Sequence, residues 1–422
     1  MNKLLIQNAT IVDPGGPMHR KQHDILIEDG KVSAVGSIQV DAESTVIDAT
    51  GLYLSFSAVD IGTQSGAPGN EQRETFESLQ AAAAVGGYGE LAIFSDTDPA
   101  IDNSSMVRTI LSQEQRQGVQ LLPIGAVEQS REKGTMAEFL DMQAAGVVSV
   151  SAGRNAIPST SFILKILEYL KGTKLTLLHR PHQNDMVSGA MVHEGSVSTT
   201  LGLKGWPYLS ETLLMERDIS LVEYISGAIS WFDLSSGPAL ELVKKAKQKQ
   251  LKVTSSTSIP YLCFAQEDNL TFDANYKFAP PLRTEYDRKL LWESLRDDVL
   301  DFVVSGHQPW EEERKKLEFP YAAFGAETLE TAFSAFITHC PFDQPEDLWV
   351  EKAVQGTRKF LYGSVPHIEE NALSDFILFD PHITHEWTQK DIRSKSKNNP
   401  FIGKVLKGRV HYRIKGNDYF EL

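Results

Sequence analysis

The sequence is poor in cysteine and in basic charge, and each shortage excludes a class of protein. Only two cysteines occur among 422 residues, Cys263 and Cys340, and neither belongs to a CxxC or CxxH pattern. A disulfide framework is therefore not expected, and the usage suits a reducing cytosol. The 56 acidic side chains outnumber the 41 basic ones, which gives a formal net charge of -15. This charge repels nucleic acid phosphates and anionic membranes, so we expect neither as a partner.

Membrane-spanning and targeting signals are also lacking. No run approaches the ~20 consecutive apolar residues that a membrane-spanning helix needs. The first residues, MNKLLIQNATIVDPGG, have a lysine but no sustained apolar stretch and no small-residue cleavage site. They are typical of a strand and turn rather than a signal peptide. We therefore expect a soluble, cytoplasmic protein.

The spacing of the apolar runs predicts the architecture. Short alternating segments between turn signals occupy the first 51 residues, and short β-like pieces return after about residue 356. Between them, apolar strand-like runs alternate with helix-like stretches. Eight buried-type runs followed by helical stretches predict an α/β fold of the (β/α)8 TIM barrel type. The runs are 52–61, 90–95, 119–125, 147–151, 174–179, 228–234, 251–256 and 301–305.

The same pattern predicts the domains. A doubly wound sheet is the competing architecture, but it normally opens with a glycine-rich phosphate loop, which this sequence does not contain. The β-like material at both ends predicts one small β-sandwich built from the two termini. Its parts are residues 1–51 and 356–422, and the barrel spans 52–355. Residues 391–400, the most polar stretch, are expected to form a surface loop.

Several short blocks resemble the dihydroorotase family of the amidohydrolase superfamily, in the family's order and over nearly the whole chain. They are Pro68-Gly69 with RETF at 73–76, Glu194-Gly195, LGLKGWP at 201–207, PPLR at 280–283, GAETLET at 325–331 and SKSKNNPFIGKVLKGRV at 394–410. The resemblance implies a metal-dependent amidohydrolase barrel with a flanking β-sandwich. It also implies zinc as the cofactor and a place in pyrimidine biosynthesis, where the family interconverts carbamoyl aspartate and dihydroorotate.

Hydrolysis of a ring amide needs an electrophile, a hydroxide nucleophile and a proton shuttle, and a zinc pair supplies the first two. Zinc takes imidazole and carboxylate ligands from the ends of several barrel strands. The resemblance places the family motif Asp-x-His-x-His-x-Arg at 60–66, where this chain has DIGTQSG. Gly62 and Gln64 therefore occupy the two metal-histidine positions, and Gly66 occupies that of the substrate-binding arginine.

Other family positions are changed as well. Asp96 occupies the place of the substrate-binding asparagine, and Ala152 lies near that of the bridging carboxylate. Asp233 aligns with the histidine of the family's His-x-Ser pattern, and Gly306 replaces the proton-shuttling aspartate. Glycine cannot transfer a proton. We therefore expect no catalytic residue and no resident zinc or other cofactor.

Two positions keep the family's residue type, Asp60 and His179, and each has a simpler interpretation. Asp60 suits a hydrogen-bond acceptor that braces a loop, and His179 suits a buried histidine with satisfied hydrogen bonds. One alternative stays open, in which His179, His182, Asp233 and His307 converge and hold one metal ion. The set expected at the barrel mouth is Asp60, Gly62, Gln64, Gly66, Asp96, Ala152, His179, Asp233, Asn275 and His307.

Three functions follow from these residues. The preferred one is a non-catalytic protein with a structural or partner-binding role linked to pyrimidine biosynthesis. The resemblance implies aspartate transcarbamoylase as that partner, because some family members are inactive companions of that enzyme. The second is an active cyclic-amide hydrolase with a rebuilt site. The third is a metal-free barrel that binds a small molecule, and Asp96 together with Gly66 favours a neutral or cationic ligand there. The expected quaternary state is a homo-oligomer.

Overall fold

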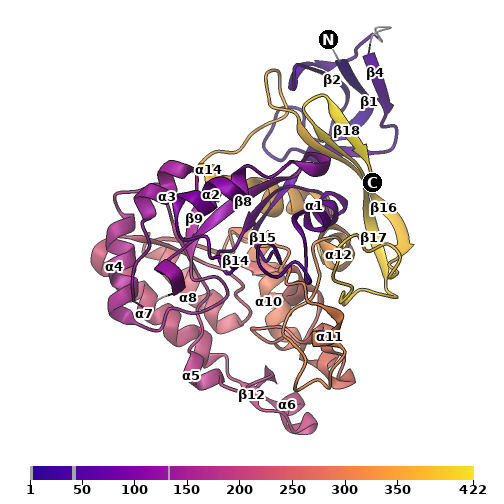
Figure 1. Cartoon of the computed structure of the whole chain (residues 1–422). Coiled ribbons are helices and arrows are strands. Elements are labelled where there is room, and N and C mark those ends of the chain that lie inside the picture. Colours follow the sequence, from indigo (N-terminus) through magenta and orange to yellow (C-terminus); the bar gives the residue numbers. More distant parts are fainter. Residues whose placement is uncertain (1–2, 40–43, 132–133) are drawn as a thin grey trace.

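Eight parallel strands form the central barrel of this protein, whose computed structural model describes residues 3–39, 44–131 and 134–422 (Figure 1). Every ladder between neighbouring strands is parallel. The predicted (β/α)8 barrel is confirmed, and each predicted run overlaps one barrel strand. In order, the strands are β6 (Ala58–Thr63), β7 (Tyr88–Ile93), β8 (Gln120–Ala126), β9 (Ser149–Ser151), β10 (Leu177–His179), β13 (Ala228–Trp231), β14 (Lys252–Ser258) and β15 (Phe302–Val304).

The barrel interior is filled by side chains that recur at every second position. Val59 and Ile61 of β6 belong to this inner core, as do Leu122 and Ile124 of β8. Successive side chains of a strand point to opposite faces, so a period of two brings one set into the interior in layers. The interior is therefore a packed core and not a pore. Its other members are Ala92, Phe94, Leu178, Phe232, Phe302 and Val304.

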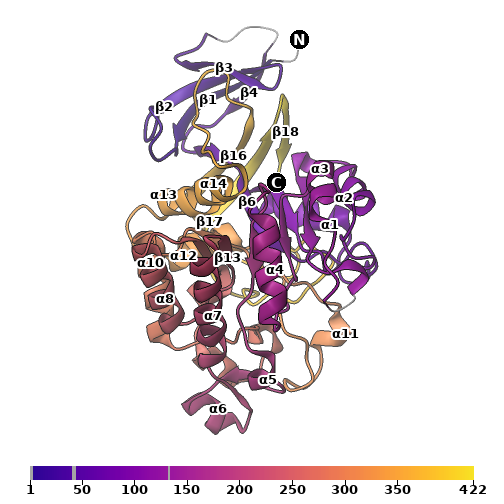
Figure 2. The same ribbon diagram turned by 90° about the vertical axis from the view of Figure 1, so that its left-hand side faces the viewer.

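Helices cover the outside of the barrel, and α4, α7, α8 and α10 stand side by side there (Figure 2). Side-chain caps define several helix starts. Thr75 and Thr284 each accept the backbone N–H three residues later, and Asn103 caps α2 in a similar way. No helix within the described ranges is both long enough and apolar enough to cross a membrane. The barrel helices are α1 (Phe76–Val85), α2 (Ser104–Leu111), α3 (Phe139–Ala145), α4 (Thr160–Leu170), α7 (Leu209–Ile225), α8 (Gly237–Gln248), α9 (Ile259–Cys263), α10 (Glu285–Arg296), α11 (Glu312–Lys315), α12 (Ala332–His339), α13 (Pro345–Trp349) and α14 (Gly356–Tyr362).

A small unit extends from the barrel at the end far from the two chain termini (Figures 1 and 2). It lies between β10 and α7 and contains a two-stranded parallel sheet, β11 paired with β12. The helix α5 contacts β12, and α6 contacts β11. This unit brings His193 and Trp206 to the barrel mouth. Its elements are α5 (Asn184–Val187), β11 (Val192–His193), α6 (Ser196–Leu201) and β12 (Gly205–Trp206).

Strands from both ends of the chain form the second β-structure, in the order β18-β17-β16-β5-β1-β2-β3, with β4 paired to β1. Figures 1 and 2 both show the indigo and yellow strands together beyond one end of the barrel. The predicted small β-sandwich assembled from both termini is confirmed. Its strands are β1 (Lys3–Ile11), β2 (Gln22–Glu28), β3 (Lys31–Gly36), β4 (Ser44–Asp48), β5 (Tyr53–Phe56), β16 (Asp375–Glu386), β17 (Val405–Lys415) and β18 (Asp418–Glu421).

The predicted first barrel run, 52–61, divides between two sheets. β5 pairs with β1 and β16 of the sandwich, whereas β6 pairs with β7 of the barrel. An apolar run predicts burial but not the sheet that buries it, so the sequence did not reveal this division. Helix α14 packs against β6 and β15 of the barrel. The domain boundaries at 51/52 and 355/356 stay predictions.

A buried ion cluster joins the sandwich to the start of the first barrel strand, β6. Ser57, between β5 and β6, donates a hydrogen bond to Asp375 (2.6 Å), and Arg358 donates to the Ser57 carbonyl (2.6 Å). Arg413 is paired with the same carboxylate, and Lys415 Nζ lies 3.1 Å from it. Burial alone would raise the pKa of Asp375, but the three cations lower it well below its usual range. Asp375 therefore fixes β16 and β17 against the barrel.

Candidate functional site

Two glycines at barrel strand ends are so closely surrounded that a side chain would collide with its neighbours. A Cβ on Gly62 would lie 2.6 Å from the ring of Phe94, and one on Gly306 would lie 2.8 Å from Cβ of Ser258. Both glycines have positive φ, +87° and +72°, a conformation that L side chains rarely adopt. The two positions that the resemblance aligns with a metal ligand and with the proton shuttle therefore have no room for a side chain in this packing.

Gly66 is enclosed by backbone rather than by a side chain. A Cβ there would lie 2.4 Å from the carbonyl oxygen of Asn70 and 2.4 Å from backbone atoms of Glu74. A backbone atom cannot rotate away as a side chain can, so an arginine at this position would require the loop to move. The place of the family's substrate-binding arginine is closed.

The centre of the barrel mouth is occupied by two phenylalanines and an ion pair. The rings of Phe94 and Phe232 lie 5.0 Å apart, and the Arg154 guanidinium lies 6.0 Å from the Phe94 centroid. Arg154 Nη1 donates to Oδ2 of Asp233 at 2.7 Å, and the Asp233 side chain is almost wholly buried. This pair places a guanidinium beside a buried carboxylate at the mouth.

His179 is held by partners on both ring nitrogens. Its Nε2 lies 3.1 Å from the backbone nitrogen of Ile157, and its Nδ1 lies 2.7 Å from Oδ2 of Asp218. A backbone N–H can only donate, so Nε2 is the acceptor and Nδ1 carries the proton. The Nε2 lone pair, which a metal would need, is therefore engaged. Trp231 Nε1 donates to the same Asp218 oxygen at 3.1 Å, and Arg217 donates to the other oxygen.

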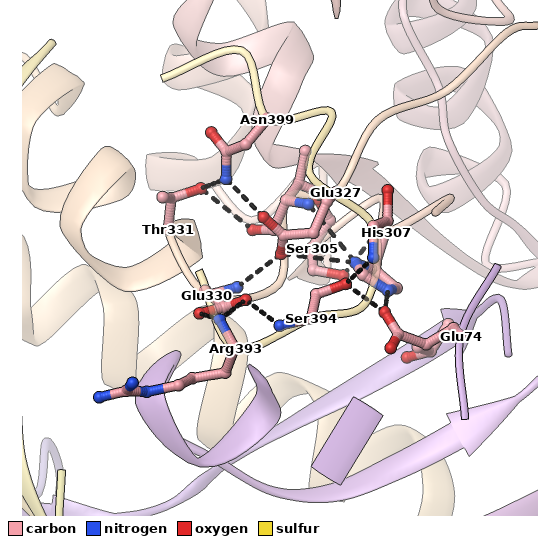
Figure 3. A network of polar contacts seen from close by, with 12 residues as sticks. Glu74, Ser305, His307, Glu327, Glu330, Thr331, Arg393, Ser394 and Asn399 are labelled. Carbon is pink, nitrogen blue, oxygen red and sulfur yellow. Dashed lines mark hydrogen bonds and ion pairs between the residues drawn. The ribbon is translucent and has the colours of Figure 1, made fainter. Parts of the chain in front are cut away.

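His307 lies within a buried network of carboxylates rather than in the open mouth (Figure 3). Its Nδ1 accepts from Thr328 N at 3.4 Å and lies 3.7 Å from Glu327, while Nε2 lies 3.8 Å from Glu74. Burial, with a smaller contribution from Arg154, lowers the pKa of His307 to about 3. Burial also raises the pKa values of both glutamates, which weakens the stabilisation that they could give to an imidazolium. The ring is therefore neutral.

Three glutamates of this network bind a C-terminal segment, residues 393–399 (Figure 3). Glu330 accepts the backbone N–H groups of residues 393 and 394 at 2.7–2.9 Å, and Glu74 accepts from residue 395 at 3.0 Å. Glu327 accepts from Asn399 Nδ2 at 2.5 Å. The prediction that 391–400 forms a surface loop is only partly correct, because the segment is a loop in which buried and exposed side chains alternate. Ser394, Ser396, Asn398 and Asn399 are buried, and Glu74 and Glu327 accept hydrogen bonds from Ser394 and Asn399, whereas Arg393, Lys395 and Lys397 are exposed.

Asp60 closes the barrel between its first and last strands. Its carboxylate accepts from Ser305 N at 2.6 Å and from Ser305 Oγ at 2.7 Å, and Thr63 donates to it as well. Beside it, Gln64 N donates to the carbonyl of His307 at 3.2 Å. Burial raises the pKa of Asp60. The side chain therefore braces the β6–β15 seam.

An open pocket of about 660 Å³ lies beside this packed centre, at the ends of β7, β8 and β9. Its charged lining residues are Asp96 and Glu128, and Gln64 Nε2 donates to Asp96 at 2.5 Å. Asn275, predicted at the mouth, instead lines a separate hollow of about 390 Å³. The other lining residues of the larger pocket are Ser95, Ala100, Ala126, Val127, Gly134, Ser151, Ala152, Asn155, Ala156, Ile157, Pro158, Ser159, Phe162 and Asn184.

Two arginines that the sequence predictions overlooked contribute to the mouth. Arg154 follows β9, and Arg180 follows β10 directly and donates to the carbonyl of Arg154 at 3.2 Å. A third, Arg283, donates to Ser235 Oγ at 3.1 Å and to the carbonyl of Trp206 at 2.8 Å. Functional side chains of barrels gather just after the strands. The positions of Arg154 and Arg180 could therefore have indicated from the sequence that they lie at the mouth.

Known proteins with similar sequences are dihydroorotases. A family model described as Dihydro-orotase-like matches residues 54–233. A dihydroorotase of Ruminiclostridium cellulolyticum is 32% identical over 419 residues, covering 98% of this chain and 97% of its own. One of Thermoanaerobacter sp. is 33% identical over 418 residues, covering 98% and 96%. The chain belongs to the dihydroorotase family.

Among solved structures, hydantoinases and a dihydropyrimidinase have folds similar to that of this chain. The L-hydantoinase (dihydropyrimidinase) of Arthrobacter aurescens superposes with a TM-score of 0.85 at 20% identity, over 99% of this chain and 96% of that one. The dihydropyrimidinase of Brevibacillus agri gives 0.81 at 21% identity, over 99% and 94%. At these identities the likeness establishes a shared fold alone.

The zinc that the dihydroorotase family implies does not fit the residues at this mouth. His179 and Asp233 are bonded within different pairs, His307 faces buried carboxylates, and the His182 ring lies 5.8 Å from that of Trp206. Across residues 3–39, 44–131 and 134–422, no three His, Cys, Asp or Glu side chains lie close enough to hold a metal ion. The four residues of the alternative one-metal site do not converge. They are His179, His182, Asp233 and His307.

Proposed function

We propose that this member of the dihydroorotase family is non-catalytic and acts by binding a protein partner. The observation that carries the proposal is the closed packing at Gly62, Gly66 and Gly306, where the family has a ligand, the substrate-binding arginine and the proton shuttle. A simple loss of side chains would leave cavities at these points. Here Phe94, the 66–74 loop and Ser258 fill the space, so the chain is packed for the absence of those groups.

The remaining groups do not supply the missing chemistry. His307 is neutral and fully buried, because burial lowers its pKa to about 3, so it cannot exchange protons with a substrate near neutral pH. His179 donates to Asp218 and accepts from Ile157, which leaves no lone pair to activate water or bind metal. Ring opening requires a nucleophile and a shuttle, and this mouth offers neither.

We infer that the role lies in assembly, with aspartate transcarbamoylase as the first partner to test. The support is analogy within the family, in which some members are inactive companions of that enzyme. The experiment mixes the purified chain with aspartate transcarbamoylase of the same organism and follows both by size-exclusion chromatography with light scattering. A joint peak is expected, and the same trace tests the proposed homo-oligomer. Separate elution at micromolar concentrations contradicts the partnership.

Turnover tests the catalytic half of the proposal. The purified chain, with and without added Zn²⁺, is incubated with dihydroorotate and separately with carbamoyl aspartate. Rates should equal those of a mock purification. A His179→Ala variant is the matched control, because contaminating host enzyme would give the same rate in both samples. Wild-type turnover above the mock value that disappears in the variant would show that the chain is an enzyme.

An active cyclic-amide hydrolase is the second candidate, and one observation favours it. Proteins named dihydroorotase are 32–33% identical to this chain over 98% of its length. Such an enzyme would need a site rebuilt around the Arg154–Asp233 pair, since that pair occupies the centre of the mouth. The turnover experiment decides between the two candidates, and metal analysis of the same sample gives an independent readout.

A further inference from the structure

Three hydroxyl groups inside the barrel are buried and have no hydrogen-bond partner among the described residues. They belong to Ser230, Thr254 and Ser256, on the neighbouring strands β13 and β14. Ser230 lies opposite Thr254 in the ladder, and Phe232, two residues after Ser230, belongs to the inner core. Side chains two residues apart on a strand share a face, so these hydroxyls face the barrel interior. Buried hydroxyls are nearly always paired, so these three indicate a polar group that the chain itself does not supply.

A large pocket reaches one of these hydroxyl-bearing residues. Thr254 lines a pocket of about 850 Å³, together with Thr176 just before β10 and Ala228 at the start of β13. Phe360 of α14 also lines it and packs against the inner core. The lining residues lie where the barrel strands begin, whereas the mouth lies where the strands end. The pocket is therefore at the opposite end of the barrel from the mouth.

The charged side chains of the pocket wall balance one another. From outside the wall, Lys247 pairs with Asp301 at 2.8 Å, and Asp347 acts on Glu351, so the surroundings add charges of both signs. Neither an anion nor a cation therefore finds a surplus of opposite charge here. The charged lining residues are the bases Lys252, Lys352 and Lys359 and the acids Asp298, Asp301 and Glu351.

Part of the wall has an uncommon backbone conformation. Lys352 and Gln355 belong to the π-helical segment η5 (Val350–Gln355), which lies between α13 and α14. Such segments are rare and frequently occur at functional sites. Gln355 Nε2 donates to the carbonyl of Pro14 at 2.8 Å, and Pro14 also lines the pocket. This hydrogen bond joins the π-helical part of the wall to the part that comes from the segment between β1 and β2.

We propose that this pocket binds a neutral, hydroxyl-rich small molecule, a monosaccharide or another polyol. A ligand hydroxyl both donates and accepts, so it pairs with the hydroxyls of Thr254 and Thr176 without needing a charge. The ring of Phe360 offers an apolar surface to the C–H groups of such a ligand. A charged ligand would lose hydration at a wall of balanced charge without a compensating surplus. The site goes beyond the proposed partner role, and neither that role nor the absence of turnover depends on it.

Saturation-transfer NMR on the full chain tests the pocket with neutral and charged probes. D-glucose, D-ribose and myo-inositol are the neutral probes, and D-gluconate and D-glucosamine are the anionic and cationic counterparts of glucose. At least one neutral probe should bind saturably at millimolar concentrations, and both charged probes should bind more weakly than it. The absence of saturable binding by every neutral probe overturns the proposal. Equal or tighter binding of gluconate or glucosamine overturns the assignment to neutral ligands.

Variants test whether the binding occurs at Thr254. Thr254→Val keeps the shape of the side chain but removes the hydroxyl, so the affinity for the bound polyol should fall about fivefold. Thr109→Val removes an exposed hydroxyl of α2 and should bind like the wild type. If Thr254→Val does not fold, Thr176→Val changes the other threonine of the wall and should weaken binding in the same direction. Unchanged affinity in the folded pocket variant contradicts the site, whatever the outcome of the turnover and partner experiments.

Discussion

His179 and Asp218 are joined by a 2.7 Å hydrogen bond between Nδ1 and Oδ2, and neither side chain has any exposed surface. Asp218 also receives Trp231 Nε1 and the Arg217 guanidinium. Burial alone would raise the pKa of Asp218, but His179 and Arg217 together hold it below its usual value. His179, which the resemblance aligns with a metal histidine of the family, is therefore part of a structural network that links β10, α7 and β13.

Asp218→Asn should destabilise the protein by about 2–4 kcal/mol, because it removes a buried carboxylate that several donors share. The folded-state pKa of Asp218 is lowered, so its contribution is present above the unfolded pKa near 4 and is lost as the pH falls. Urea unfolding at pH 7 and pH 4 measures both effects. The exposed Asp297→Asn serves as control and should leave the midpoint unchanged. Equal midpoints for Asp218→Asn and the wild type at pH 7 would contradict this role.

Gly62→His should destabilise the chain by about 2–4 kcal/mol and should not create zinc binding. The positive φ and the collision with Phe94 both oppose a side chain there. Gln64→His is the matched control, since the half-buried Gln64 already holds a side chain, and it should change stability little. Thermal melts and zinc analysis of both variants give the readout. A Gly62→His variant as stable as the wild type would show that Phe94 moves aside.

Chelator should leave the melting temperature unchanged. No metal ligands converge at the mouth within the described residues, and the Arg154–Asp233 pair already compensates the buried carboxylate there. The measurement compares scanning calorimetry before and after dialysis against EDTA, with zinc determined by elemental analysis. One or two zinc ions per chain, lost together with several degrees of melting temperature, would contradict both the prediction and the proposed function.

Asp375→Asn should cost about 3–5 kcal/mol at pH 7, because it leaves Arg413 and Arg358 buried without their shared carboxylate. The pKa of Asp375 is lowered in the folded state, so the difference between variant and wild type should shrink as the pH falls below about 4. Denaturant unfolding at pH 7, 5 and 3.5 tests this. The exposed Asp141→Asn on α3 provides the comparison. A stability difference between Asp375→Asn and the wild type that grows toward low pH would contradict this prediction.

Glu330→Gln should make the melting temperature less sensitive to pH between pH 6 and pH 9. Burial and Glu327 raise the pKa of Glu330 in the folded state. The stability linked to this group is therefore present at low pH and lost as the pH rises through the raised pKa. Wild-type melting temperature should fall more than that of the variant between pH 6 and pH 9. Exposed Glu241→Gln should behave like the wild type, and parallel curves for Glu330→Gln would refute the assignment.

Local pattern was enough to predict most of the architecture. The eight apolar runs after residue 52 were visible because barrel strands are buried on both faces, and their alternation with helices admits few topologies. The residue types at 62, 66 and 306 predicted, through the family resemblance, that catalytic groups have changed. What the pattern could not show was whether those positions were vacant or filled, because a collision with Phe94 joins residues 32 apart in the chain.

The sequence by itself determined the barrel and the sandwich built from both termini, and through the resemblance it predicted where family side chains are missing. These follow from local periodicity and residue identity. Only the tertiary structure decided that Arg154 and Arg180 gather at the mouth, that His307 turns toward Glu74 and that polar side chains such as Ser394 and Asn399 are buried. Each of these depends on partners distant in the sequence, since a polar group becomes stable inside a protein only where folding brings it a hydrogen-bond or charge partner.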